Sequence, residues 1–237
     1  MKQNLADMTG NTYNGRPYTV CHMMSSIDGR IDCDMTENLG DTDAYYAALD
    51  ELQCDACLEG RVSMQKHTAL PGTFKADNPA PIGREAWHNA GNKGQYKIGI
   101  DTHGTLLWSD KEAEDNLLVI TDEACPRQYH DRLTAQGISW IACGGNGIDL
   151  RRAVQILHGE FGINRLAIVG GGHINAAFLT AGLLDEVSLM VGAGIDGRKG
   201  MTAVFDGIED SNYPTTVLKL ADVRRVGENT VWMRYKM

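Results

Sequence analysis

The sequence predicts a single-domain α/β protein with a mixed, mostly parallel central sheet, flanking helices and antiparallel C-terminal strands. Short apolar segments alternate with helical segments along most of the chain, as in βαβ units. The segments 215–223 and 230–235 are rich in Thr, Val and aromatic residues, which favours an antiparallel pair at the end. A hydrophobic fraction of 43% in 237 residues is enough for one full core.

The individual elements follow from hydrophobic spacing and from capping residues. Strands are expected at 17–24, 55–58, 97–100, 117–120, 138–142, 166–169 and 186–191. Helices are expected at 42–52, 62–69, 126–136, 150–161 and 175–184. Asp41 or Thr42 is suited to cap the first helix, and Asp149 the fourth. Pro126 fits the first turn of the third helix and Gly137 fits its end.

One domain is expected over residues 1–237, with an N-terminal extension at 1–16 and an insertion at 71–95. Glycines and prolines interrupt the insertion, and a loop of this length in a compact domain is often a lid. Trp87 within it is suited to stacking on a planar substrate. A solvated surface insertion is the alternative.

Charge and cysteine content limit the partners. The net charge of −9 argues against general binding to nucleic acid or anionic membranes. No apolar run is long enough for a membrane span and the first residues lack a signal-peptide core, which predicts a cytoplasmic protein. Cys54 and Cys57 have the spacing of a redox or metal pair, but no second Cys/His pair stands at zinc spacing. We therefore expect no metal and interpret these cysteines as small hydrophobic residues.

The strongest functional signal lies in residues 164–186. A short buried strand ends in Gly170, Gly171 and Gly172, and helical spacing follows. Such a turn exposes free backbone N–H groups at the positive end of a helix, where a phosphate or pyrophosphate binds. Glycine is suited to this position because a Cβ atom would block the approach of the ligand. A glycine-rich turn without a ligand is the alternative.

This segment resembles a known family. Residues 169–179 resemble the cofactor-binding segment of dihydrofolate reductases, and residues 181–187 resemble the reductase domain of the riboflavin-pathway deaminase-reductases. The resemblance implies a dihydrofolate reductase-like fold, a small-molecule substrate, a homodimer, and NADPH as cofactor with NADH as the alternative. It implies cofactor contacts from Gly170, Gly171, Gly172, His173, Ile174 and Asn175.

Residues 23–31 contain Ser-Ile-Asp-Gly and resemble the Ser-x-Asp-Gly segment of the same reductases, which lies beside the nicotinamide. The resemblance implies that Met24 and Ser26 line the cofactor site and that Ser25 faces the substrate. Asp28 is the best side-chain candidate for the proton donor, although Asp-Gly is by itself a turn signal. Asn38 and His67 complete the expected substrate contacts.

Residues 55–64 resemble the family's Asp-Ala-x-x-x-Gly-x-x-Thr segment and the Gly-Arg-x-Thr turn of dihydrofolate reductase. The resemblance implies cofactor contacts from Gly60, Arg61, Val62 and Ser63, because an Arg guanidinium can bind a phosphate through two hydrogen bonds. A surface cation and a helix cap are the alternatives for Arg61 and Ser63. The resemblance implies that the later turn at Thr121 faces the ribose and its 2′-phosphate, which Asp122 and Glu123 would repel unless they are turned away.

Three departures from the riboflavin reductases concern the substrate. This chain has Gly170 where they usually have Glu, Glu51 where they have Arg, and residues 66–69 where they have Asp-Asp-Pro. We therefore predict an NAD(P)H-dependent reductase that transfers hydride to a C=N or C=O of a small, planar substrate and acts poorly on the riboflavin intermediate. The alternatives are the 2,5-diamino-6-ribosylamino-pyrimidinone 5′-phosphate or 5-amino-6-(5-phosphoribosylamino)uracil reductase of riboflavin biosynthesis, and a non-catalytic dinucleotide-binding protein.

Overall fold

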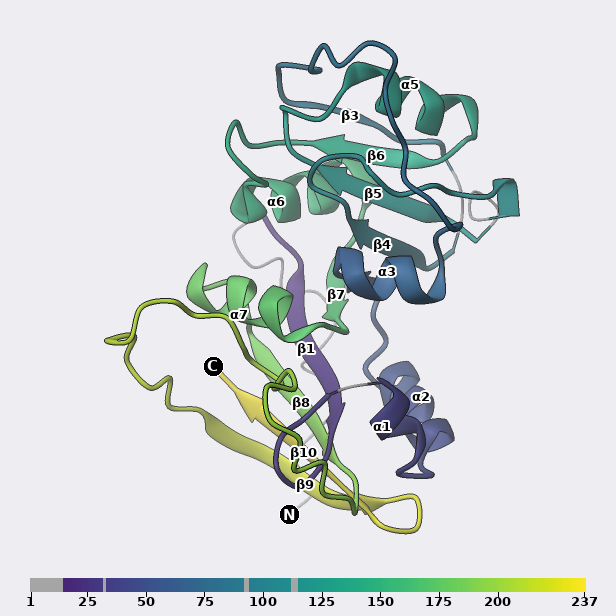
Figure 1. Ribbon diagram of the computed structural model, residues 1–237. Helices are drawn as coiled ribbons and strands as arrows, with labels where there is room; N and C mark the ends of the chain where they lie inside the picture. Colours follow the sequence, from purple (N-terminus) through teal and green to yellow (C-terminus); the bar gives the residue numbers. More distant parts are fainter. Residues whose placement is uncertain (1–14, 32, 92–93, 112–114) are drawn as a thin grey trace.

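In the computed structural model, which describes residues 15–31, 33–91, 94–111 and 115–237, ten strands form one continuous sheet (Figure 1). Their order across the sheet is β3-β6-β5-β4-β2-β7-β1-β8-β10-β9. The strands are β1 (Tyr18–Ser25), β2 (Ala56–Glu59), β3 (Ala86–His88), β4 (Tyr96–Ile100), β5 (Leu117–Thr121), β6 (Ser139–Ala142), β7 (Arg165–Ile168), β8 (Glu186–Val191), β9 (Lys219–Val226) and β10 (Thr230–Lys236).

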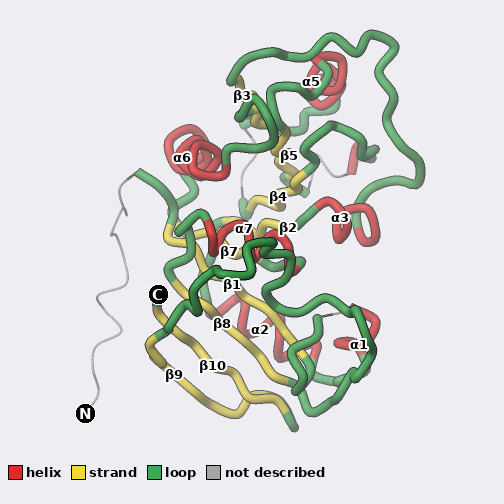
Figure 2. The backbone as a smooth tube through the Cα atoms, turned by 60° about the vertical axis from the view of Figure 1, so that its left-hand side comes forward, coloured by secondary structure: helices red, strands yellow, loops and turns green. Residues whose placement is uncertain are grey.

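Neighbouring strands from β6 to β8 are all parallel, and β10 runs antiparallel between β8 and β9. The mixed α/β sheet with an antiparallel C-terminal end is thus confirmed, although β9 begins four residues later than expected. Figure 2 shows this C-terminal hairpin at the end of the molecule remote from helix α5 (Arg127–Ala135).

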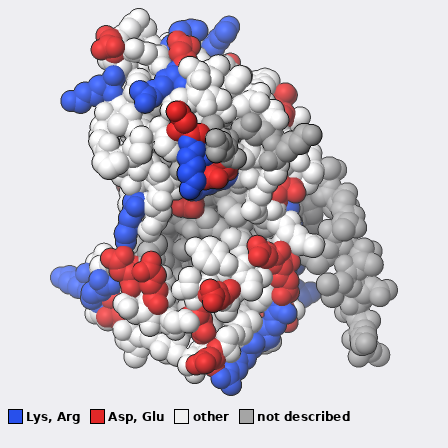
Figure 3. All heavy atoms as spheres, turned by 90° about the vertical axis from the view of Figure 1, so that its right-hand side faces the viewer, with Lys and Arg blue, Asp and Glu red and all other residues white. Residues whose placement is uncertain are grey.

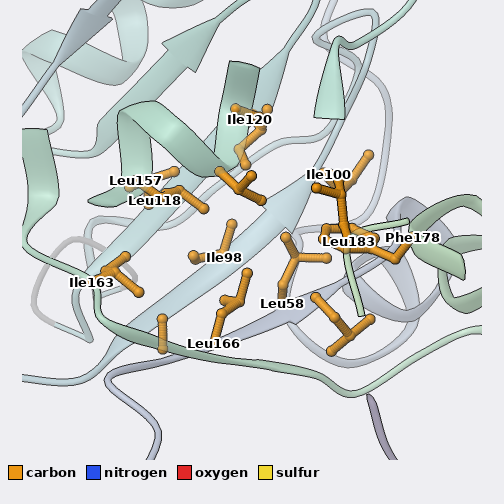
Figure 4. Close-up of a cluster of buried hydrophobic side chains, with 14 of the residues drawn as sticks. Leu58, Ile98, Ile100, Leu118, Ile120, Leu157, Ile163, Leu166, Phe178 and Leu183 are labelled. Carbon is orange, nitrogen blue, oxygen red and sulfur yellow. The ribbon is translucent and has the colours of Figure 1, made fainter. Parts of the chain in front are cut away.

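Helices cover both faces of the sheet. They are α1 (Cys33–Glu37), α2 (Thr42–Glu51), α3 (Arg61–His67), α5, α6 (Leu150–Phe161) and α7 (Gly172–Thr180). Helices α6 and α7 pack on one face, where Leu157 and Phe178 meet strand residues such as Ile98 and Leu58 (Figure 4). Helices α2, α3 and α5 pack on the opposite face. The site therefore forms at the edge where the parallel strands end and these helices begin.

The two expected aspartate caps have different roles. Asp149 caps α6, since its Oδ1 accepts a hydrogen bond from the Arg152 N–H at 3.1 Å. Asp41 precedes α2 but forms no side-chain cap there. Its carboxylate instead accepts hydrogen bonds from the Glu228 N–H at 3.2 Å and from the Thr230 hydroxyl, so it anchors the β9–β10 turn.

The 71–95 insertion carries a strand that the sequence analysis did not expect. It contains β3, which pairs antiparallel with β6 and places Trp87 opposite Ile141. This pairing covers what would otherwise be an exposed edge of β6. Trp87 is 38% exposed and lines neither cavity of the site described below, which corrects its assignment to the substrate.

The predicted N-terminal extension lies outside the described residues except for Gly15 and Arg16. Arg16 forms an ion pair with Asp185 at 2.7 Å and so fixes the approach to β1. Within the described part of the chain, no helix has the length and apolar character needed to cross a membrane.

Candidate active site

Two helices begin at one cavity. Helix α3 follows β2 and helix α7 follows β7, and these strands are neighbours in the sheet. Their first turns border a cavity of about 900 Å³, with the loop after β4 and residues 201–202 as further walls. We call it the cofactor cavity, after the cofactor contacts that the sequence analysis expects there. It is lined by Ile31, Gly60, Arg61, Val62, Ser63, Gln65, Lys66, His67, Thr73, Ile100, Thr102, His103, Thr105, Gly171, Gly172, His173, Ile174, Met201 and Thr202.

Both helix starts present backbone donors. Gly60 and Gly171 are the N-cap residues of α3 and α7, and neither supplies a side-chain cap. The first N–H groups of each helix have no partner within the helix and lie at its positive end. The Gly60 N–H donates to the Gly170 carbonyl at 2.9 Å, which holds the two turns together. The cavity therefore has paired donor sites for an anion such as a pyrophosphate.

The glycines of these turns serve different purposes. A Cβ atom at Gly60 would lie 2.8 Å from the Ile174 side chain, and one at Gly172 would lie 2.3 Å from the Ala203 carbonyl oxygen. Gly60 and Gly172 are thus required by packing within the protein. A Cβ atom at Gly171 would meet no protein atom within 4 Å, so this residue faces open space. Gly170 has a φ of +120°, a conformation that favours glycine.

The loop after β4 lines the cavity beside Ile100, and the sequence analysis missed it. Asp101 is fully buried, and its Oδ2 accepts hydrogen bonds from the Thr105 and Leu106 N–H groups at 2.8 Å each. It also accepts from the Tyr129 hydroxyl at 2.8 Å. This network presents Thr102, His103 and Thr105 to the cavity. The signal in the sequence was a polar segment, Asp-Thr-His-Gly-Thr, directly after a buried strand.

Thr121 does not reach the cofactor cavity. It is fully buried, and its Oγ1 lies 2.8 Å from His130 Nε2. The carboxylates of Asp122 and Glu123 accept hydrogen bonds from the backbone N–H groups of Ala124 and Gly144, both at 3.1 Å. Asp122 Oδ2 is also 3.7 Å from Nδ1 of His103, whose side chain is 75% exposed.

A second cavity of about 570 Å³ adjoins the first and shares Ile31, Ser63 and His67 with it. We call it the substrate cavity, after the substrate contact expected of His67. The face that carries α1, α2 and α3 is hollowed, with acidic side chains gathered along one rim (Figure 3). The other residues that line the substrate cavity are Met23, Met24, Thr36, Glu37, Thr42, Tyr45, Tyr46, Leu49, Cys57, Glu59, Thr68, Gln95, Tyr96, Lys97, Asp115 and Val169. His67 thus lines both cavities, whereas Met24, which was expected at the cofactor, lines only this second cavity. Cys57 is partly exposed in it.

Glu59 is a second residue that the sequence analysis missed. It ends β2, points to the same side as Cys57 and is partly buried in the substrate cavity. Within the described residues, no group forms a hydrogen bond with its carboxyl group, and burial raises its pKa above the usual value. A carboxyl group with a raised pKa binds a proton more readily than a free one and can donate it to a bound molecule.

Asp28 and its neighbours lie outside both cavities. Ser25 and Ser26 are buried, and Asp28 is on the surface. The Asp28 carboxylate accepts hydrogen bonds from the Ser26 hydroxyl at 2.7 Å and from the Gly197 N–H at 2.9 Å. These bonds hold the pKa of Asp28 well below its usual range, so it carries no proton to donate near neutral pH. The assignment of Asp28 as proton donor is therefore corrected.

Two asparagines and one acidic residue also lie elsewhere than expected. Asn175 is fully buried and donates to the Val204 carbonyl at 2.6 Å. Asn38 is exposed and donates to the Asp34 carbonyl at 2.8 Å, and it lines neither cavity. Glu51, expected at the substrate phosphate, pairs with Arg224 at the end of α2.

Comparisons with known sequences agree with this geometry. A family model of the RibD C-terminal domain matches residues 17–232. The chain is 24% identical over 203 residues to 2,5-diamino-6-ribosylamino-4(3H)-pyrimidinone 5′-phosphate reductase of Methanothermobacter thermautotrophicus, covering 81% of this chain and 85% of that protein. It is 21% identical over 199 residues to riboflavin biosynthesis protein RibD of Chlamydia muridarum, covering 81% of this chain but only 50% of that protein.

Solved structures show the same fold. A pyrimidine reductase-like protein of Corynebacterium diphtheriae matches with a TM-score of 0.69 at 19% identity, covering 93% of this chain and 91% of that one. The riboflavin biosynthesis reductase of Saccharomyces cerevisiae matches with a TM-score of 0.62 at 16% identity, covering 96% and 92%. With the family model spanning most of its length, the chain belongs to the RibD C-terminal domain family and is a reductase with a dihydrofolate reductase-like fold.

Proposed function

We propose that this protein uses NADPH to reduce a C=N bond of a planar pyrimidine-type substrate. The observation that supports this most directly is the junction of the two cavities. A cavity with two helix starts, suited to a pyrophosphate, shares Ser63 and His67 with a cavity that holds a partly buried carboxyl group. Hydride transfer needs a dinucleotide on one side of such a junction and a proton source on the other.

The residues of the cofactor cavity fit NADPH. The first N–H groups of α3 and α7 would hold the pyrophosphate, and the open space beside Gly171 leaves room for it. Arg61 and His103 line the same cavity and would bind the 2′-phosphate that distinguishes NADPH from NADH. When bound, NADPH supplies the hydride.

Glu59 replaces Asp28 as the proposed proton donor. Reduction of a C=N bond adds a hydride to carbon and a proton to nitrogen. Glu59 stands in the substrate cavity immediately before the turn at Gly60, and its raised pKa favours the protonated form that can donate. After donation, the carboxylate regains a proton from solvent, assisted by the neighbouring His67.

The substrate named for the Methanothermobacter relative is the first candidate. Glu51 was one of the three reasons to expect poor activity on it, and Glu51 lies outside the substrate cavity. The second candidate is an unphosphorylated planar imine or carbonyl compound. It is favoured by the cavity's acidic residues Glu37 and Asp115, which repel a phosphate, whereas Lys97 attracts one.

Steady-state NADPH oxidation tests both candidates. The substrates are the ribosylaminopyrimidinone 5′-phosphate, its dephosphorylated form, and a panel of small imines and carbonyls. Faster turnover of the phosphorylated pyrimidine supports the first candidate, and faster turnover of any unphosphorylated compound supports the second. Calorimetric binding of NADPH without turnover of any of them would contradict the proposed activity and favour a non-catalytic dinucleotide-binding protein.

We further propose that the protein is a homodimer that associates through its C-terminal strands. Strand β9 lies at the edge of the sheet, and seven of its eight residues are exposed. Leu220, Val223 and Val231 add exposed apolar surface on this hairpin, which an uncovered edge seldom tolerates. Light scattering should report about twice the chain mass of 25.9 kDa, and Val223→Lys should give the monomer. A monomeric wild-type protein would contradict the proposal.

A further inference from the structure

The segment that follows β8, residues 192–207, forms a strap that returns toward the start of α7 (Figure 1). Its residues Met201 and Thr202 line the cofactor cavity, although neither belongs to a helix or strand. A loop is held in place by its contacts with the rest of the protein. The contacts of the strap therefore decide the shape of the cofactor cavity on this side.

The Asp28 turn holds one end of the strap. The Asp28 carboxylate accepts hydrogen bonds from the backbone N–H groups of Asp196 and Gly197 at 3.0 and 2.9 Å. The Ser26 hydroxyl donates to the same carboxylate at 2.7 Å and fixes its orientation. The hydrogen bonds that the Asp28 carboxylate accepts therefore come from the strap and from its own turn.

Residues after Asp28 extend this attachment. Arg30 forms an antiparallel bridge with Ala203 and donates from its guanidinium to the Met201 carbonyl at 2.5 Å. The Ile31 N–H donates to the Thr202 carbonyl at 3.2 Å. The two strap residues that line the cavity are thus held through their backbone carbonyls, while their side chains remain available to the cavity.

Helix α7 holds the other end. Asn175 is fully buried and donates to the Val204 carbonyl at 2.6 Å. The Asp206 N–H donates to the Gly172 carbonyl at 3.2 Å, and Gly172 packs against the Ala203 carbonyl oxygen. The glycine turn thus shapes the cofactor cavity in two ways. Its own backbone N–H groups face the cavity, and its contacts hold the strap in place.

We infer that Asp28 and Asn175 are positioning residues for the cofactor, which pin the two ends of the strap so that Met201 and Thr202 wall the cofactor cavity. The inference rests on the proposed dinucleotide function. It explains why neither residue lies in a cavity although both belong to the motifs that resemble cofactor-binding segments. The hydrogen bonds to Asp28 keep its pKa low, so the carboxylate stays charged and the attachment persists across the neutral range.

Hydrogen exchange and NADPH calorimetry on Asp28→Asn and Asn175→Ser test the inference. In Asp28→Asn, the amides of Asp196 and Gly197 should exchange at least about tenfold faster in the ligand-free chain, and the NADPH dissociation constant should rise by about tenfold. Asn175→Ser should likewise speed amide exchange and raise the NADPH dissociation constant, because it loosens the end of the strap that α7 holds. Asp210→Asn is the matched control, because Asp210 also binds a backbone N–H but lies outside the strap. It should change neither quantity.

Met201→Ala separates action through the strap from a general structural effect. It should weaken NADPH binding without changing exchange at Asp196 and Gly197. In Asp28→Asn combined with Met201→Ala, the two losses of affinity should be less than multiplicative, since both act through one contact. Unchanged exchange in Asp28→Asn, or fully multiplicative losses, would overturn the inference. Absence of NADPH binding by the wild-type chain would instead overturn the proposed function, and the exchange data would still decide whether Asp28 holds the strap.

Discussion

The cofactor cavity and the substrate cavity differ in what builds them. The first is shaped largely by main chain, with two helix starts and the turns at Gly60 and Gly171. The second is shaped by side chains from strands and helices that are far apart in sequence, among them Tyr45, Glu59 and Lys97. A main-chain site keeps its chemistry when surrounding side chains change, whereas a side-chain site changes with each substitution. One fold can therefore retain its cofactor while its substrate is altered.

The largest effect should appear in the substrate cavity, which is shaped by side chains. Glu59→Gln keeps the size of the side chain but removes the proposed proton, so kcat should fall by about a hundredfold or more, while NADPH affinity stays unchanged. Because burial raises the pKa of Glu59, wild-type activity should decline as pH rises through that value, and the variant should lack this decline. Steady-state kinetics across pH measures both.

Glu37→Gln is the control, since Glu37 is an exposed acid in the same cavity. It should reduce kcat far less than Glu59→Gln. Equal losses in the two variants would show that the cavity's charge matters and that no single carboxyl group delivers the proton.

The next largest effect should appear in the cofactor cavity, which is shaped largely by main chain. In Gly171→Val the new side chain meets no protein atom near its Cβ position, so the fold should survive while the pyrophosphate site is filled. NADPH affinity should fall by about thirtyfold, or roughly 2 kcal/mol. Gly171→Ala should cost less, and Gly172 is unsuitable because its Cβ atom would strike Ala203. Unchanged affinity in a folded Gly171→Val protein would remove this turn from the cofactor site.

The same difference explains how much the sequence could predict. The glycine turn at 170–172 and the turn at Gly60 were recognisable because strand, glycine and helix follow one another locally in the sequence. Each parallel strand was located to within one residue at either end, because continuous apolar runs mark strands buried on both faces. Antiparallel β3 was missed because its pairing with β6 is long-range and its own sequence, Ala-Trp-His, is too short to show a pattern.

Side-chain destinations were much harder to predict. Asp28 and Asn175 belong to the recognised motifs, but their partners lie in a strap far along the sequence, which no local pattern reveals. Glu59 directly followed the strand expected at 55–58, and only its neighbours in space show that its carboxyl group is partly buried and faces a cavity. Local spacing identifies where a ligand meets the backbone, whereas the roles of side chains depend on tertiary packing.

A smaller effect should distinguish the two cofactors. Arg61→Ala should reduce the preference for NADPH over NADH by about tenfold, because a guanidinium bound to a phosphate contributes a charge-assisted hydrogen bond. His103→Ala should reduce it less, since His103 also lies 3.7 Å from the Asp122 carboxylate. Calorimetric titration with both dinucleotides measures the ratio. Equal wild-type affinities for NADPH and NADH would contradict the assignment of a 2′-phosphate site.

A buried histidine lies behind each of the two cavities. His22 stacks on Tyr45 of the substrate cavity with ring centroids 4.6 Å apart, and His130 lies behind Thr121 near the loop of the cofactor cavity. Burial lowers the pKa of each from 6.5 to about 4. The unfolded chain therefore binds protons first on acidification, and stability that is present above pH 6.5 is lost as pH falls toward 4. Each histidine should contribute up to about 1.4 kcal/mol per pH unit, and urea unfolding should show a shallower loss in His22→Gln. If the free energy of unfolding falls equally with pH in His22→Gln and in the wild-type protein, His22 does not cause the loss of stability. Another group must then account for it.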